Sequence, residues 1–204
     1  MITDKLIYSS LIRGDSNTSL DLLRKTPFPS RKDEQWKYSP LKKLKKLPFI
    51  NNSGFSVKNI STLNLPQMNG LILVLENGRV NANLSEFHKI NGIKLSFLSS
   101  SKEYDNPIIN SKKENYFSLL NSSYLSEGIT IEVGSGFRVQ ENINIINIVS
   151  SNDSLVNTKL DLILSENSSI HIRQYFLAFG KTTNGFINHN NNFIVQNNAA
   201  LVLD

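Results

Sequence analysis

Two ten-residue segments near the C-terminal end of the chain share one pattern of apolar and polar residues. Residues 163–172 (ILSENSSIHI) align without a gap on residues 194–203 (IVQNNAALVL), at an offset of 31 residues. Residues 133–139 (VGSGFRV) fit the same frame with one residue deleted. The frame is an apolar strand end, a polar turn, a small residue and a second apolar alternation. Such a repeat is typical of a solenoid, because each unit has an apolar side that only its neighbour can bury.

From about residue 127 onward the sequence consists of short strand-like runs and turns. Asn and Gly occupy the expected corners, where they tolerate left-handed φ angles. Strong two-residue hairpin turns are lacking in this part, so a stacked parallel β-helix is favoured over a meander. A β-sandwich would give short strands at the same density and stays an alternative.

The beginning of the chain has the spacing of short helices. Residues 3–13 are one predicted helix, which Gly14 ends. A second is expected at about 17–25, before the prolines of residues 26–29. A third starts at Pro40 and carries an apolar stripe formed by Leu41, Leu44 and Leu47.

The middle of the chain mixes both kinds of pattern. An apolar run from residue 70 leads into Asn77-Gly78, a strong hairpin signal, and residues 92–98 alternate as a strand would. Residues 115–125 are predicted to be a helix. The expected organisation is therefore mostly β with an N-terminal α region, in three parts: a helical region 1–48, a mixed α+β linker region with a hairpin 49–126, and the start of a parallel β-helix 127–204.

The chain contains no cysteine, which excludes disulfides, Cys-based metal sites and a thiolate nucleophile. A histidine metal site would need several ligands close together. His88, His171 and His189 are instead interpreted as surface or corner residues. No phosphate-binding loop of the GxxxxGK[ST] kind is present, so nucleotide hydrolysis would have to come from a partner.

Positive charge is concentrated near the N-terminus. The formal net charge is +5, and seven of the 22 Lys and Arg residues fall between Arg31 and Lys46. We interpret them as a solvated helix face beside the leucine stripe. A basic RNA-associated protein is an alternative, although no aromatic platform or RNP-like string accompanies the charge, so nucleic acid is not the expected partner. Salt-dependent RNA binding would support that alternative.

Residues 26–47 also hold the only tryptophan, within the string DEQWKY. Because aromatic side chains carry a large apolar area, Trp36 and Tyr38 are predicted to anchor the helical region by packing. Glu34 is interpreted as a partner of Arg31 or Lys37, or as a cap for the next helix. The spacing of the segment resembles the N-terminal signature of the SufB/SufD family of iron–sulfur cluster assembly proteins, closest to SufD, and the matching residues are Pro29, Arg31, Glu34, Trp36, Lys37 and Tyr38.

A second segment carries the same resemblance. Residues 115–133 are similar to the stretch of that family in which an F-x-x-L-N helix leads into a strand that begins with Gly. The resemblance implies an N-terminal helical region followed by a right-handed parallel β-helix. Members of the family are longer and end in a C-terminal helical region, so the β-helix is expected to be incomplete at the C-terminus of this chain.

The resemblance implies a non-catalytic scaffold subunit of the Suf complex. The iron–sulfur cluster would be assembled by the complex, with no cofactor bound by this chain alone. The partners would be a SufB-like sister subunit and a SufC-like ATPase. The family recruits the ATPase through its C-terminal region, so a truncated chain without that region is expected to have lost the contact with the ATPase. The expected location is the cytoplasm, or a plastid in a eukaryote, because the N-terminus lacks the pattern of a signal peptide and no apolar run of about 20 residues could span a membrane.

A carbohydrate-processing β-helix enzyme is the alternative from another functional class, since one architecture hosts many functions. Such enzymes cluster acidic residues on one face of the solenoid. Here Asp153, Asp161 and Glu166 are scattered along the sequence, which weakens that alternative.

Overall fold

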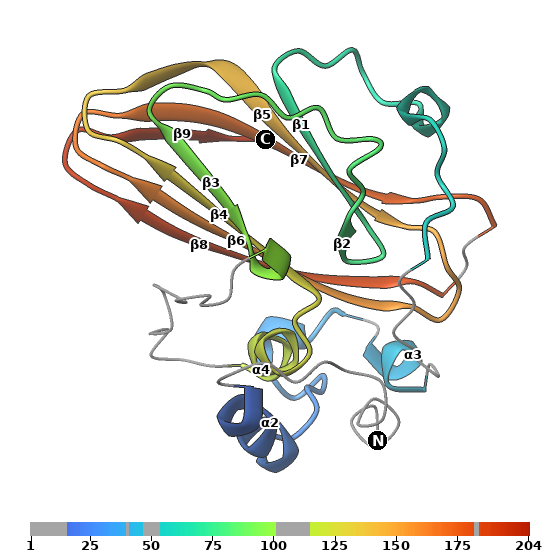
Figure 1. Cartoon of the computed structure of the whole chain (residues 1–204). Coiled ribbons are helices and arrows are strands. Elements are labelled where there is room, and N and C mark those ends of the chain that lie inside the picture. Colours follow the sequence, from blue (N-terminus) through green and yellow to red (C-terminus); the bar gives the residue numbers. More distant parts are fainter. Residues whose placement is uncertain (1–15, 40, 47–53, 101–114, 182–183) are drawn as a thin grey trace.

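The protein is mostly β, with short helices gathered beside two sheets (Figure 1). The computed structural model describes residues 16–39, 41–46, 54–100, 115–181 and 184–204. Successive long strands of the C-terminal half alternate between the two sheets, so that each strand pairs with the next but one.

The first sheet has the strand order β2-β1-β5-β7-β9. Its β1, β5, β7 and β9 run parallel, and β2 is antiparallel to β1. The bounds are β1 Leu71–Glu76, β2 Arg79–Val80, β5 Arg138–Val149, β7 Ser169–Ala178 and β9 Ala200–Leu203. The predicted hairpin is confirmed: Asn77 and Gly78 join β1 to β2 with φ angles of 48° and 75°, the positive values that a tight two-residue turn needs.

The second sheet has the order β3-β4-β6-β8. Its β4, β6 and β8 are parallel, while β3 is antiparallel to β4. The bounds are β3 Ile93–Phe97, β4 Glu127–Val133, β6 Leu155–Leu164 and β8 Phe186–Val195. The segment 49–126 therefore supplies β1, β2 and β3 to the same sheets as the segment 127–204.

The register of β6 and β8 matches the sequence repeat. Ile163 is the partner of Ile194 in the parallel ladder, which confirms the prediction that these two residues occupy neighbouring strands. The turns repeat as well, because Gly136, Asn167 and Asn198 all have positive φ, at 77°, 59° and 56°. The backbone N–H of Gly136 donates to the carbonyl of Glu166 over 2.9 Å, so one turn is hydrogen-bonded to the next.

The expected one-residue deletion in the first repeat is wrong. Val133 pairs with Leu164 and Arg138 with Ser169, so the first turn is as long as the second. The irregularity lies further on, where the register shifts between Arg138 and Asn142 of β5. Such a bulge adds residues to one strand only, and no particular residue type marks it in the sequence.

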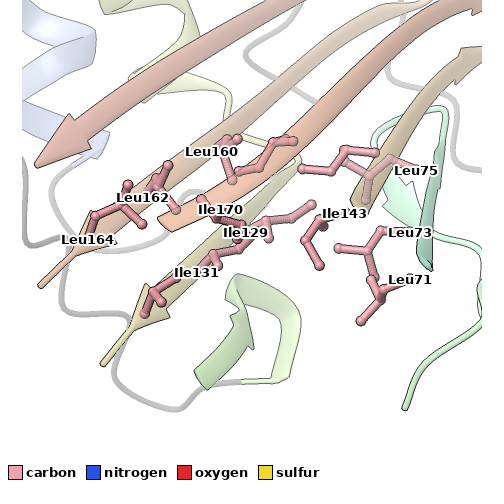
Figure 2. Packing of buried hydrophobic residues seen from close by; sticks show 13 residues of the cluster. Leu71, Leu73, Leu75, Ile129, Ile131, Ile143, Leu160, Leu162, Leu164 and Ile170 are labelled. Carbon is pink, nitrogen blue, oxygen red and sulfur yellow. The ribbon is translucent and has the colours of Figure 1, made fainter. Parts of the chain in front are cut away.

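A continuous apolar core lies between the two sheets (Figure 2). Alternate Leu and Ile side chains of β1 and β5 meet those of β4 and β6, because a strand directs every second side chain to the same face. The labelled members in Figure 2 are Leu71, Leu73, Leu75, Ile129, Ile131, Ile143, Leu160, Leu162, Leu164 and Ile170.

The helices confirm the predicted ones where the structure describes them. The helix expected at 17–25 is α2 (Ser16–Lys25), the third is α3 (Leu41–Lys46), and the one expected at 115–125 is α4 (Tyr116–Ser123). Three short 3₁₀ helices are also present in the described residues, namely η1 (Glu34–Trp36), η2 (Ile60–Leu63) and η3 (Leu98–Ser100). The predictions for residues 3–13, Gly14, Pro40 and Leu47 lie outside the described residues.

Helix α4 joins the helical region to the second sheet. The side chain of Asn115 caps its start by accepting a hydrogen bond from the N–H of Ser118 over 2.9 Å. Leu20 and Leu23 of α2 are buried in one cluster with Leu120 of α4, to which β6 contributes Leu155. The N-terminal helices are thus fixed to the sheet through α4.

Candidate functional site

Trp36 packs on α4, as the sequence predicted for an anchor. Its ring centroid lies 4.9 Å from that of Phe117, with 57° between the ring planes. The ring of Phe28 lies 6.1 Å from the same Phe117, and the partly buried Leu41 and Leu44 of α3 join this cluster. The segment around η1 is therefore attached to α4 by aromatic contacts.

The anchor interpretation is wrong for Tyr38, which is 88% exposed. Tyr38 follows η1 in a turn, and Lys37 Nζ lies 5.6 Å from the centre of its ring. Pro29 is half-buried, and Arg31 and Lys37 are exposed. Of the six residues of the motif, Trp36 is the one whose ring contacts an aromatic side chain of the buried cluster, that of Phe117.

Glu34 has neither of its predicted roles. It is exposed, forms no ion pair with Arg31 or Lys37, and stands inside η1 rather than before a helix. The carboxylate that orders this segment belongs to its neighbour: Asp33 Oδ2 accepts from the N–H of Ser30 over 2.7 Å. This turn, which the side chain of Asp33 closes, was not predicted from the sequence. Ser and Asp three residues apart are typical of such a turn.

His189 forms the centre of a polar network between the sheets. Its Nδ1 lies 2.8 Å from Thr158 Oγ1 on β6, and its Nε2 lies 3.0 Å from Gln174 Nε2 on β7. Asn191 Oδ1 lies 2.9 Å from the same Nε2 and accepts from Gln174 over 3.0 Å. Thr158 Oγ1 donates to Asn147 Oδ1 of β5 over 3.2 Å.

Burial lowers the pKa of His189, while the hydrogen bond with Asn191 opposes this shift. A lowered pKa favours the neutral imidazole. The neutral ring has one N–H and one unprotonated nitrogen, so it donates one hydrogen bond and accepts another within this network. The surface-or-corner interpretation is therefore wrong for His189, which lies within β8.

The other two histidines pair with carboxylates. His88 Nε2 lies 2.7 Å from Glu141 Oε2, and His171 Nε2 lies 2.7 Å from Asp204 Oδ2. The hydrogen bond from His171 lowers the pKa of the Asp204 carboxyl, and Arg173 adds to the effect. His171 and His189 thus have separate partners, and the described residues include no group of three or more His, Asp or Glu side chains that could hold a metal ion.

The acidic residues are not assembled into one set. Asp161 is fully buried, with its Oδ2 3.0 Å from Lys159 Nζ and its Oδ1 accepting from Asn192 over 2.8 Å. Asp153 accepts from Asn184 over 3.1 Å. Both of these amide contacts join residues 31 positions apart, so these carboxylates connect neighbouring repeats.

An asparagine ladder was missed by the sequence reasoning. Asn188 Nδ2 donates to Asn157 Oδ1 over 2.9 Å, again 31 residues away. Asn121 of α4 donates to the backbone carbonyls of Thr158 and Asn188, over 2.9 and 2.7 Å. The signal was available, since Asn recurs at the repeat distance at positions 157 and 188.

No family model matches the chain, and no curated protein matches it. No helix within the described ranges has both the length and the apolar character needed to cross a membrane.

Proposed function

We propose that this protein is a non-catalytic scaffold subunit, similar to SufD, of a complex that assembles iron–sulfur clusters. The observation that supports the proposal most is the contact between Trp36 and Phe117. These residues belong to the two segments, 29–38 and 115–133, that carry the resemblance to the SufB/SufD family. The two segments that carry the resemblance lie far apart in the sequence and meet in one aromatic cluster.

At the level of the fold, we propose that the two sheets are faces of a right-handed parallel β-helix. Three observations support this architecture: strands alternate between the sheets, β4, β6 and β8 pair in parallel, and their registers are offset by 31 residues. The turns stack with the same offset, at Gly136 and Asn167. A crystal structure in which the chain winds left-handed would contradict this part of the proposal.

In the proposed complex this chain supplies surface and rigidity rather than reactive groups. Iron–sulfur chemistry uses thiolates as ligands, and this chain has no cysteine. The thiolates and the ATPase activity would come from a SufB-like sister subunit and a SufC-like ATPase. The cytoplasm, or a plastid in a eukaryote, is the proposed location.

A genetic experiment tests this function. We expect that deletion of the gene in the source organism lowers the activity of iron–sulfur enzymes when iron is limiting. The wild-type gene should restore that activity, and a Tyr38→Ala variant should do so equally well because Tyr38 is exposed. Unchanged iron–sulfur enzyme activity in the deletion strain would overturn the proposal.

A further inference from the structure

An apolar pocket enters the core at the edge of the two sheets where β1 and β3 lie. Its volume is about 180 Å³. Leu71 and Ile143 of the first sheet line one side, and Leu95 and Ile131 of the second sheet line the other. Figure 2 labels Leu71, Ile143 and Ile131, whose side chains point into the space between the sheets.

The pocket is open to solvent, since its lining includes the exposed His88 and Lys89. Binding pockets for small molecules are concave and lined mainly by hydrophobic side chains, with a small number of polar groups that fix the orientation of the ligand. The lining of this pocket has that character. The pocket is therefore suited to an aliphatic group that would contact Leu95 and Ile131.

The lining of the pocket also includes a lysine. His88, Lys89 and Ile90, from the connection between β2 and β3, and Ile93 of β3 complete the lining. The carboxylate of Glu141 lies 2.7 Å from His88 Nε2. Lys89 is exposed and has no ion pair with any residue that the structure describes. An anionic group at the mouth would meet this ammonium group.

We propose that the pocket binds an unbranched aliphatic carboxylic acid. The alkyl chain lies between Leu71 and Leu95, and the carboxylate lies at Lys89. This site is independent of the scaffold function proposed above, since it uses neither the aromatic cluster of Trp36 nor the polar network of His189.

Octanoate and octanol are suitable probes, because they share a chain length and differ in charge. We expect titration of the full chain to give saturable one-to-one binding of octanoate, tighter than that of octanol. Lys89→Gln should weaken octanoate binding about threefold, the range of one exposed charge contact, and leave octanol binding unchanged. Lys94→Gln is the matched control, since Lys94 is occupied by Glu132 over 2.7 Å and should have no effect.

Leu95→Phe should fill the pocket and abolish the binding of both probes. If that variant does not fold, nuclear Overhauser contacts between octanoate and the methyl groups of Leu71 and Ile143 in the wild-type chain serve instead. The proposal is overturned if octanoate does not bind, if Leu95→Phe binds it as well as wild type, or if the wild-type contacts fall on other methyl groups. Equal binding of octanoate and octanol would overturn the role of Lys89.

Discussion

The ring centroids of Trp36 and Phe117 lie 4.9 Å apart, and this contact connects the N-terminal segment to the sheets. Phe117 belongs to α4, whose Asn121 donates hydrogen bonds to the backbone of β6 and β8. A continuous series of contacts therefore runs from Trp36 to the strands, which is why we expect changes at Trp36 to affect the whole domain.

Trp36→Ala should destabilise the protein by about 2 kcal/mol. Truncation of a fully buried Trp costs about 3–5 kcal/mol, and Trp36 is only half-buried. Part of the loss is the aromatic contact with Phe117, worth about 1 kcal/mol. Urea denaturation followed by circular dichroism measures the free energy of unfolding.

Tyr38→Ala is the matched control for this experiment. Tyr38 stands two residues away in the same motif but is 88% exposed, so its truncation should change the free energy of unfolding by less than about 0.5 kcal/mol. Equal effects of the two substitutions would show that Trp36 is not an anchor.

The repeat could be predicted because its turns constrain residue type. Gly136, Asn167 and Asn198 adopt positive φ, which Gly and Asn tolerate, so the corners were visible in the sequence. The bulge after Arg138 could not be predicted, because a bulge depends on how β5 pairs with β7 rather than on one residue. The exposure of Tyr38 could not be predicted either, because Trp36, two residues earlier in the same motif, is packed against Phe117.

Asn121→Ala should loosen α4 from the second sheet. Asn121 is buried, and its amide satisfies the carbonyls of Thr158 and Asn188 at once. Removing the donor leaves polar groups unsatisfied, which costs about 2 kcal/mol. Thermal denaturation and hydrogen exchange of α4 measure the effect.

Asn83→Ala provides the comparison for that substitution, because Asn83 is exposed. The melting temperature of Asn83→Ala should stay near that of wild type. If Asn121→Ala melts at the wild-type temperature as well, the attachment of α4 does not depend on this amide.

His189 should make the stability of the protein depend on pH. Its pKa is lower in the folded state than the ordinary histidine value of about 6.5, chiefly through burial, so the unfolded chain binds the proton more readily. The stabilising contribution is complete above the unfolded pKa and is lost as the pH falls through the folded pKa. The free energy of unfolding at pH 7.5 should therefore exceed that at pH 5.5.

His189→Gln isolates this contribution, since glutamine does not titrate. The groups in contact with His189 are uncharged, namely Thr158, Gln174, Asn191 and the ring of Phe176. We expect the free energy of unfolding of wild type to rise, relative to that of His189→Gln, as the pH increases from 5.5 to 7.5. Profiles that stay parallel over this whole range would contradict a lowered pKa.

The network around His189 was beyond reach of the sequence alone. Its members come from β5, β6, β7 and β8, and their proximity depends on registers that no short motif encodes. One contact was accessible in principle, since Thr158 and His189 are 31 residues apart, the distance of the repeat. The contact of His189 with Gln174 could not be predicted, because it depends on how the first sheet is placed against the second.

Co-purification tests the scaffold function most directly. This chain, tagged and co-expressed with the SufB-like and SufC-like proteins of the same genome, should be recovered with both, with the mass of the assembly measured by native mass spectrometry. The chain purified by itself should hydrolyse no ATP and retain no stoichiometric iron or sulfide, because it has neither a phosphate-binding loop nor a cysteine. Recovery of the chain alone, while the SufB-like and SufC-like proteins bind each other, would contradict the account.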